Sequence, residues 1–427
     1  MTRFSIKLFI VLVCSCVLMP EYTHARVNSI TGTLSMREGY DSNIYRTKDN
    51  EVSGWTTTIS PILNITSQGK NDSLSFVYGP GFTRDHEREE TKVDQHLDLI
   101  GAKNFSQTFR TSLRETYIRT SDTYLQSEVL IDEVRLLRPD KTKERLWTNT
   151  VFLQMDYTFA QESVFNLAYT NYILEHTSSG PYNDYIRHNP STSLTYRLND
   201  FWSVLASYSY IKGDFDESPD LKTHAPGLQL RYRYSPKTTF FGSYGFNKTD
   251  YTGDGNQDYK YHDVSLGTDH DINPLTNISL SAGFSRTERQ TNSQNAFNYG
   301  LNLTKGLKGG SLSVRGSGGF TQADFDGSDD GLSRYWSIGG SLNYQLTEKS
   351  NVNAYARIRH DDYLEQSPST EEYGYNGGGG FSFLLTRWLT ISLQYGYLQV
   401  DADNSTNDYV DHRFYIALAA AKELWRW

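Results

Sequence analysis

The sequence has almost no cysteine and no long apolar run, and both absences narrow the class of protein. Its two cysteines, Cys14 and Cys16, lie near the N-terminus, so the rest of the chain has no thiol with which to build a disulfide framework. The runs of about 20 apolar residues that helical membrane proteins need are also missing. Stability, and any crossing of a membrane, must therefore come from another architecture.

The balance of charge excludes a second class of protein. The chain carries 41 lysines and arginines against 50 aspartates and glutamates, a formal net charge of −9, whereas a general nucleic-acid-binding protein is basic. Aromatic residues make up 14% of the sequence, and disordered chains are poor in them. No shift in composition marks a domain boundary. We therefore expect one large, ordered β-architecture with no nucleic acid among its partners.

The N-terminal residues have the order of a secretory signal peptide. Basic residues flank the start of an apolar run at 8–19, and Ala25 ends a short cleavage-site motif. The run is too short for a transmembrane helix. Lipidation at Cys16 is the alternative, which is less favoured because another cysteine stands two positions before it. We predict a signal peptide at 1–25 and a mature chain at 26–427.

Most of the mature chain alternates apolar with polar residues. In 389–397 every odd position is apolar or aromatic and every even position is small or polar, and 228–234 and 278–284 repeat this pattern. A period of two is that of a β-strand with two different faces. No stretch of comparable length has a helical period with caps at its ends. The sequence therefore predicts an all-β protein.

The connections between the predicted strands alternate in length. Nine short turns and ten longer polar loops separate 20 strands, with 18 strands as the lower alternative. Short turns at one end and long loops at the other are typical of outer-membrane barrels, in which closure leaves no backbone group unpaired in the bilayer. We predict a single antiparallel transmembrane β-barrel in the outer membrane of a Gram-negative bacterium, with short periplasmic turns and longer extracellular loops. The predicted turns are 69–72, 105–107, 160–162, 199–200, 235–237, 273–275, 305–309, 347–349 and 386–387, and the predicted loops are 46–53, 87–92, 121–145, 176–185, 214–223, 252–258, 289–294, 326–332, 362–371 and 401–410.

Aromatic pairs two residues apart lie near the ends of many predicted strands. Tyr208/Tyr210, Tyr259/Tyr261 and Tyr395/Tyr397 lie next to long loops, and we assign them to the aromatic girdles at the level of the lipid headgroups. A soluble sandwich or propeller is the alternative, but no blade-length motif repeats. The chain ends on Trp427, which resembles the signal read by the barrel-assembly machinery, a partner that we therefore expect.

The residues of the first predicted strand carry a family resemblance. Glu38-Gly39-Tyr40-Asp41-Ser42-Asn43-Ile44 resembles the opening E-x-Y-D-x-N-I motif of a family of outer-membrane β-barrel porins. Members of that family are often encoded with exopolysaccharide biosynthesis and export systems of Gram-negative bacteria. The resemblance implies an exit conduit for a secreted polysaccharide, with that polysaccharide and periplasmic export proteins as partners. It carries over no catalytic residue.

Basic residues are prominent on the strand faces opposite the apolar ones, which would line a lumen. A guanidinium suits carboxylates and sulfates, so passage of an anionic or polyhydroxyl chain is one interpretation. The alternative is that these arginines pair with lumen aspartates and only make the wall rigid. The predicted pore-lining residues are Arg110, Arg114, Arg197, Arg231, Arg233, Arg315, Arg357 and Arg359, and the predicted lumen aspartates include Asp98, Asp156, Asp263 and Asp269.

Two kinds of loop stand out. The longest, 121–145, is rich in both charges and is the candidate for a constriction that folds into the lumen, although an ordinary surface loop explains it equally. The acidic loops at 214–220, 324–330 and 401–408 are expected to form a solvated outer surface beside outer-membrane lipids and lipopolysaccharide. The acidic loop at 326–331 lacks the spacing of an EF-hand. We therefore expect no metal and no cofactor.

The sequence does not favour an enzyme. His360, Asp361 and Asp362 could be imagined as acid–base groups, but no local motif supplies a nucleophile, and solvation at the end of a strand explains them. Three hypotheses remain, which are a conduit for exopolysaccharide export, a passive porin for small solutes or oligosaccharides, and a non-conducting structural or adhesive barrel.

Overall fold

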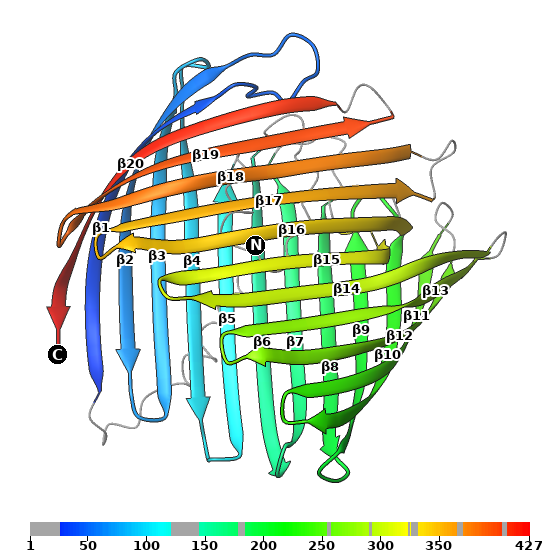
Figure 1. The fold of residues 1–427 in the computed structure, drawn as a ribbon. Coiled ribbons are helices and arrows are strands. Elements are labelled where there is room, and N and C mark those ends of the chain that lie inside the picture. The colour runs from blue at the N-terminus through cyan, green and yellow to red at the C-terminus, as the bar shows by residue number, and fades with distance from the viewer. Residues whose placement is uncertain are drawn as a thin grey trace.

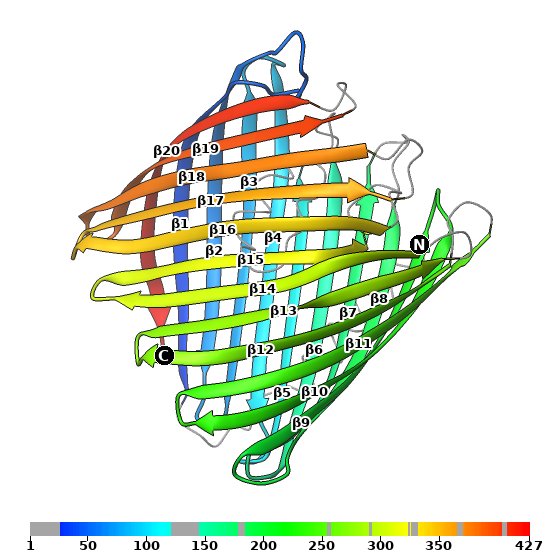
Figure 2. The same cartoon turned by 45° about the vertical axis from the view of Figure 1, so that its right-hand side comes forward.

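The structure confirms the predicted fold class. It is a computed structural model in which the chain forms a closed ring of 20 antiparallel strands (Figures 1 and 2). Strands of the near wall cross those of the far wall steeply in Figure 1, as the tilt of barrel strands requires. The predicted signal peptide at 1–25 lies outside the described residues. The described residues are 26–120, 145–177, 184–253, 258–289, 293–322, 325, 332–364, 370–403 and 408–427.

Every strand pairs with its neighbours in the sequence, and β1 also pairs with β20. In the part of the chain that the structure describes, no helix is long and apolar enough to cross a membrane. The strands are β1 (Val27–Asp41), β2 (Gly54–Gln68), β3 (Asp72–Asp85), β4 (Glu90–Asn104), β5 (Phe109–Thr120), β6 (Leu146–Ala160), β7 (Ser163–His176), β8 (Tyr185–Arg197), β9 (Trp202–Phe215), β10 (Asp220–Ser235), β11 (Thr238–Thr252), β12 (Tyr259–Asn273), β13 (Thr276–Arg289), β14 (Ser293–Leu307), β15 (Gly310–Gln322), β16 (Leu332–Thr347), β17 (Ser350–Tyr363), β18 (Thr370–Thr386), β19 (Leu389–Ala402) and β20 (Tyr409–Arg426).

The connections follow the predicted alternation, with most of the long loops shorter than expected and those after β1 and β15 longer. The short turns fall where the sequence predicted them; for example, residues 236–237 join β10 to β11 and residues 348–349 join β16 to β17. The predicted loop at 214–223 is only 216–219, because β9 and β10 continue into it. Cross-strand hydrogen bonding therefore extends further into the polar ends of the strands than their hydrophobic pattern suggested.

The outer face of the barrel is apolar. Leu228, Leu230, Val264, Leu266 and Phe284 lie at alternate positions of β10, β12 and β13, and Leu266 and Phe284 are each 71% exposed. A continuous apolar band of this kind is unfavourable in water. It is the surface that a transmembrane barrel presents to lipid.

Backbone pairing closes the ring at its short-turn end. The Asn28 amide donates to the Trp427 carbonyl oxygen at 2.9 Å, and the Trp427 amide donates back to the Asn28 carbonyl oxygen at 3.1 Å. The Arg26 guanidinium forms an ion pair with Asp72 at 2.7 Å beside this contact. Because the ring closes, the sheet has no free edge, which is the condition for β-structure to cross a bilayer.

Residues of the first-strand motif fasten the same seam at its long-loop end. The Asn43 side chain is fully buried; its Nδ2 donates to the carbonyl oxygens of Thr47 at 2.7 Å and Val410 at 3.1 Å, and its Oδ1 accepts from the Thr47 amide at 3.1 Å. The buried Arg413 Nε lies 2.7 Å from an Asp411 oxygen. We call Asp41, Asn43, Asp411 and Arg413 the seam brace. The motif thus has a structural role in joining the first and last strands.

Four hairpins share a short motif at their long-loop ends, which we call the rim repeat. Each copy has Asp, then Tyr or Leu, then two residues and His. The Asp carboxylate accepts the backbone amide at the end of the preceding strand at 2.8 to 3.0 Å, and the Tyr or Leu is buried, 0 to 4% exposed. The His ring Nδ1 is hydrogen-bonded to a Tyr hydroxyl of the preceding strand at 2.7 to 2.9 Å. The copies are 184–188, 220–224, 258–262 and 408–412.

Substitution of Gly283 by Ala is expected to destabilise the barrel. A Cβ at this position would lie 1.9 Å from the Val264 carbonyl oxygen and 2.7 Å from the Ser265 Cα, and backbone atoms of a strand ladder cannot move aside separately. We expect Gly283→Ala to lower the free energy of unfolding by about 2–3 kcal/mol, measured by urea unfolding of the vesicle-inserted barrel. Gly245→Ala is the control, because its Cβ would meet only the Asp263 Cβ, at 3.7 Å. Equal losses in the two variants would contradict the prediction.

Candidate pore and its extracellular mouth

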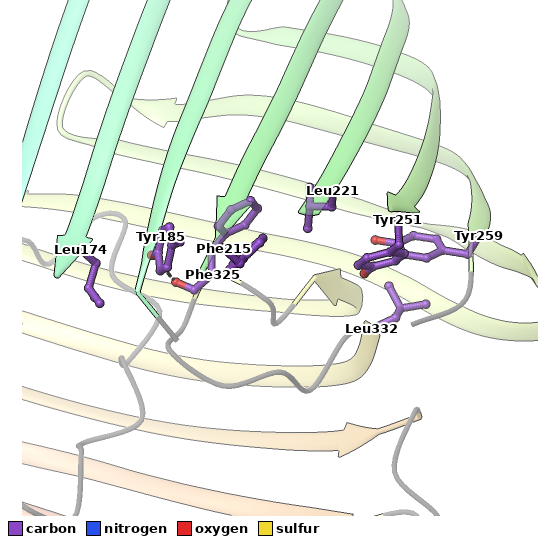
Figure 3. Packing of buried hydrophobic residues seen from close by; sticks show 8 residues of the cluster. All are labelled: Leu174, Tyr185, Phe215, Leu221, Tyr251, Tyr259, Phe325 and Leu332. Atoms are coloured by element: carbon purple, nitrogen blue, oxygen red, sulfur yellow. Dashed lines mark hydrogen bonds between the residues drawn. The ribbon is translucent and has the colours of Figure 1, made fainter. Parts of the chain in front are cut away.

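Apolar side chains gather on the inner face of the barrel at its long-loop end. They come from β7 to β12, from β16 and from the connection between β15 and β16 (Figure 3). Because β8 and β16 are far apart in the ring, their residues share one cluster only across the interior, and this contact identifies the inner face of β7 to β12. The cluster consists of Leu174, Tyr185, Phe215, Leu221, Tyr251, Tyr259, Phe325 and Leu332.

Phe325 makes most of this contact across the lumen. Its ring centroid lies 5.4 Å from those of Tyr185 and Phe215, and the Arg187 guanidinium carbon lies 5.0 Å from it. The Tyr185 hydroxyl donates to the Phe325 carbonyl oxygen at 2.7 Å (Figure 3). Gly213 leaves room for the ring, since a Cβ there would lie 2.9 Å from it. Phe325 therefore narrows the mouth of the lumen, and we call these interactions the Phe325 contact.

When the register is followed from β7 to β12 around the ring, the eight predicted arginines fall on the inner face. Two of them meet at the short-turn end, where Glu162 forms ion pairs with Arg197 at 3.0 Å and with Arg233 at 2.8 Å. Arg197 also contacts Asp200 at 2.7 Å. Exposed pairs of this kind stabilise a protein by less than about 1 kcal/mol. They nevertheless occupy both arginines within the wall.

Two more of the predicted arginines are paired further along the wall. Arg231 lies 2.5 Å from Asp269, and Arg359 lies 2.5 Å from Asp361. For these four paired arginines the geometry agrees with the alternative interpretation, in which arginine and aspartate make the wall rigid. Arg315 on β15 and Arg357 on β17 lie on either side of the same residue of β16 in the strand register.

The predicted lumen aspartates are all engaged by the wall. Each is hydrogen-bonded to at least two side chains of its own strand or of strands one or two places away. Hydrogen bonds of this kind favour the ionised form of a carboxylate and hold it in a fixed place in the wall. These residues are Asp98, Asp156, Asp263 and Asp269.

Two arginines of β5 differ from the rest of the predicted set. Arg110 and Arg114 are exposed, and with the described residues neither makes a hydrogen bond or an ion pair within 4.0 Å. Asp156, opposite Arg110 in the register, is hydrogen-bonded to other side chains. Arg114 lies between Ile100 and Phe152 in the register, and it interacts electrostatically with Asp98 without forming an ion pair. The inner wall therefore presents free positive charge at β5.

Two solved structures support the fold at the level of architecture, and a third has a lower TM-score. The ferric-catecholate import receptor Fiu of E. coli K12 superposes with a TM-score of 0.53 at 9% identity, over 94% of this chain and 82% of that one. A variant of the ferric enterobactin receptor PfeA of Pseudomonas aeruginosa gives 0.51 at 10% identity, over 92% and 81%. The porin OccK3 of the same species gives 0.44 at 12% identity, over 93% and 96%.

The closed antiparallel barrel and its apolar outer band decide the class of protein. The chain is an outer-membrane β-barrel. A family model described as "Putative MetA-pathway of phenol degradation" matches residues 249–368, which is less than half of the chain. No curated protein sequence matches this chain.

The barrel corrects two expectations about its extracellular end. Tyr259 and Tyr261 were assigned to the lipid-facing girdle, but Tyr259 belongs to the inner cluster and Tyr261 packs against it. Two residues that are two positions apart on a strand share a face, but this spacing does not show whether that face is directed to the lipid or to the lumen. The acidic loops are also not simply solvated, since Asp220 and Asp408 accept backbone amides that close their hairpins.

Two other predictions have a more limited outcome. The 121–145 loop, proposed as a constriction, lies outside the described residues except for Arg145, whose guanidinium donates to the Val93 carbonyl oxygen. Of the imagined acid–base group, Asp361 pairs with an inner-face arginine, whereas Asp362 pairs with Arg334 at 2.6 Å. Within the described ranges, no group of three or more His, Cys, Asp or Glu side chains could hold a metal ion.

Proposed function

We propose that this barrel is a channel that favours anions and that its substrate is an anionic polysaccharide on its way out of the cell. The observation that carries the proposal is the pair of exposed arginines on the inner face of β5, which make no ion pair with the described residues. The lumen aspartates are occupied by hydrogen bonds, whereas Arg110 and Arg114 are exposed. Guanidinium groups with free donors bind carboxylates and sulfates, and positive charge beside the ion path concentrates anions locally.

The choice of a polysaccharide rests on the first-strand motif. Its resemblance to porins encoded with exopolysaccharide systems supports a glycan as the substrate and periplasmic export proteins as partners. The polar inner wall, with free guanidinium donors next to Ser and Thr side chains, can exchange hydrogen bonds with a hydrated chain.

The charge argument is tested by ion selectivity in a planar bilayer. Arg110→Ser with Arg114→Ser is expected to lower the anion-to-cation permeability ratio about three- to tenfold, because two unpaired charges near the ion path are removed. The measurement is the reversal potential in a KCl gradient. Arg197→Ser with Arg233→Ser is the matched control, since both of these arginines are already paired with Glu162. A selectivity that is the same in both double variants would refute the assignment to β5.

A passive porin for small solutes or oligosaccharides is the second candidate. The Phe325 contact narrows the mouth, which suits small molecules better than a polymer, and the partial family match at 249–368 carries a description from phenol degradation. Graded polymers distinguish the two candidates. Block of the current by an anionic glycan larger than about 2 kDa, entering from the periplasmic side, supports export; free passage of small solutes without glycan block supports the porin. A folded barrel that does not conduct would instead be structural or adhesive.

A further inference from the structure

Two neighbouring copies of the rim repeat carry lysines on the outer, lipid-facing side. Lys222 follows the buried leucine of the β10 copy, and Lys260 follows the buried tyrosine of the β12 copy. In the strand register Lys222 lies directly opposite Lys212, and Lys260 lies directly opposite Lys248. Like charges that face each other across two strands are destabilising. The outer rim of β9 to β12 therefore holds two unfavourable pairs side by side.

The fold itself does not require these lysines. In the other two copies of the rim repeat, the same register position pairs Ile173 with Ile186 and Gln399 with Val410. The closing aspartate and the outward histidine are nevertheless present in all four copies, and a buried Tyr or Leu follows the aspartate in each. The lysines are thus an addition to two adjacent hairpins rather than part of the hairpin architecture.

Nearby carboxylates neutralise only part of this charge. Lys212 pairs with Asp214 at 2.7 Å and Lys248 with Asp250 at 2.8 Å, each along its own strand. Lys222 and Lys260 are exposed and, with the described residues, make no hydrogen bond or ion pair. On β13 Arg286 adds a further cation, which is 56% exposed although it pairs with Glu288 at 3.2 Å. In the strand register Lys222 also lies opposite Asp250, and Lys260 lies opposite Glu288. The surface is therefore of mixed charge, but the ammonium groups of Lys222 and Lys260 keep donors that are available to a ligand.

The position of this surface points to its ligand. It lies on the outer face at the long-loop ends of the strands, above tyrosines that bond the rim histidines and above the apolar band. In an outer membrane this level holds the headgroups of the outer leaflet, and lysine is a good partner for phosphate. We propose that the outer rim of β9 to β13 is a binding site for the phosphate groups of the phosphorylated glycolipid of the outer leaflet. The site is defined by Lys212, Lys222, Lys248, Lys260 and Arg286, and it is independent of what passes through the lumen.

The site is tested with the full barrel in detergent, by native mass spectrometry with lipid A that carries two phosphates and with lipid A from which both have been removed. The wild-type barrel is expected to bind the phosphorylated lipid about tenfold more tightly, as two or three partly exposed ion pairs would give. Equal affinity for the two lipids would overturn the proposal without recourse to any variant.

A variant that copies the sister hairpins locates the site. Lys222→Ile with Lys260→Val introduces the residues that the other copies carry, so folding, checked by heat-dependent gel mobility, is expected to be preserved. Its affinity for phosphorylated lipid A should fall to that for the phosphate-free lipid. The control is Lys305→Gln with Lys422→Gln, two exposed lysines at the short-turn end. Loss of lipid binding in the control, or retention in the first variant, would show that the phosphates bind elsewhere.

Discussion

The Phe325→Ala variant is expected to conduct more ions than the wild-type barrel. The substitution removes a ring that is 7% exposed and packs on Tyr185 and Phe215. Truncation of a buried phenylalanine costs about 3–5 kcal/mol, so the population in which this residue crosses the lumen should fall more than about a hundredfold. The measurement is single-channel conductance in a planar bilayer, with the open fraction as a second readout.

A graded control separates the ring from the backbone hydrogen bond. Tyr185→Phe keeps the aromatic packing and removes only the hydroxyl that donates to the Phe325 carbonyl oxygen, at a cost of about 1 kcal/mol. Its conductance should lie between those of the wild type and Phe325→Ala. If Phe325→Ala conducts as the wild type does, the Phe325 contact does not limit the pore, and the narrowest point lies elsewhere.

The Asn43→Ala variant is expected to lose much of the stability of the closed barrel. Asn43 is fully buried and satisfies three backbone groups, two on Thr47 and one on Val410. Removal of the side chain leaves these groups without partners inside the seam, at about 3–5 kcal/mol in total. Urea unfolding in lipid vesicles, followed by gel mobility without heating, measures the loss.

The matched control comes from the same connection. Glu51→Ala changes an exposed residue of the segment between β1 and β2 and is expected to change the free energy of unfolding by less than about 0.5 kcal/mol. If the two variants are equally stable, the first-strand motif does not hold the seam and its role must be sought elsewhere.

The barrel architecture could be predicted because it depends on local pattern. Alternation at 389–397 and the contrast between short turns and long loops are readable from single segments, and together they gave the strand number that the structure has. Loop bounds were less accurate, because mixed polar and apolar residues at 214–215 and 220–223 continue the ladder beyond the lipid-facing apolar band.

The contacts at the mouth of the pore could not be predicted in the same way. Phe325 lies in an acidic segment that reads as a solvated loop, and its partners Tyr185 and Phe215 are more than 100 positions away in the sequence. A contact across the lumen produces no periodic pattern in the nearby sequence. The rim repeat, in contrast, is visible in the sequence, since Asp-[Tyr/Leu]-x-x-His recurs at 184, 220, 258 and 408. It was not predicted, because repeats of the length of a propeller blade do not reveal a motif of five residues.

Closure of the ring also has a consequence for how the barrel folds. Nineteen of its strand pairings join neighbours in the sequence, and the pairing of β1 with β20 joins the two most distant strands. The entropy of loop closure makes that one pairing about 3 kcal/mol more costly than a hairpin, and non-local contacts of this kind slow folding. The seam brace supplies buried hydrogen bonds at this junction, comparable in free energy with that entropic cost. It is thus placed where an otherwise nearly complete sheet would be most prone to remain open.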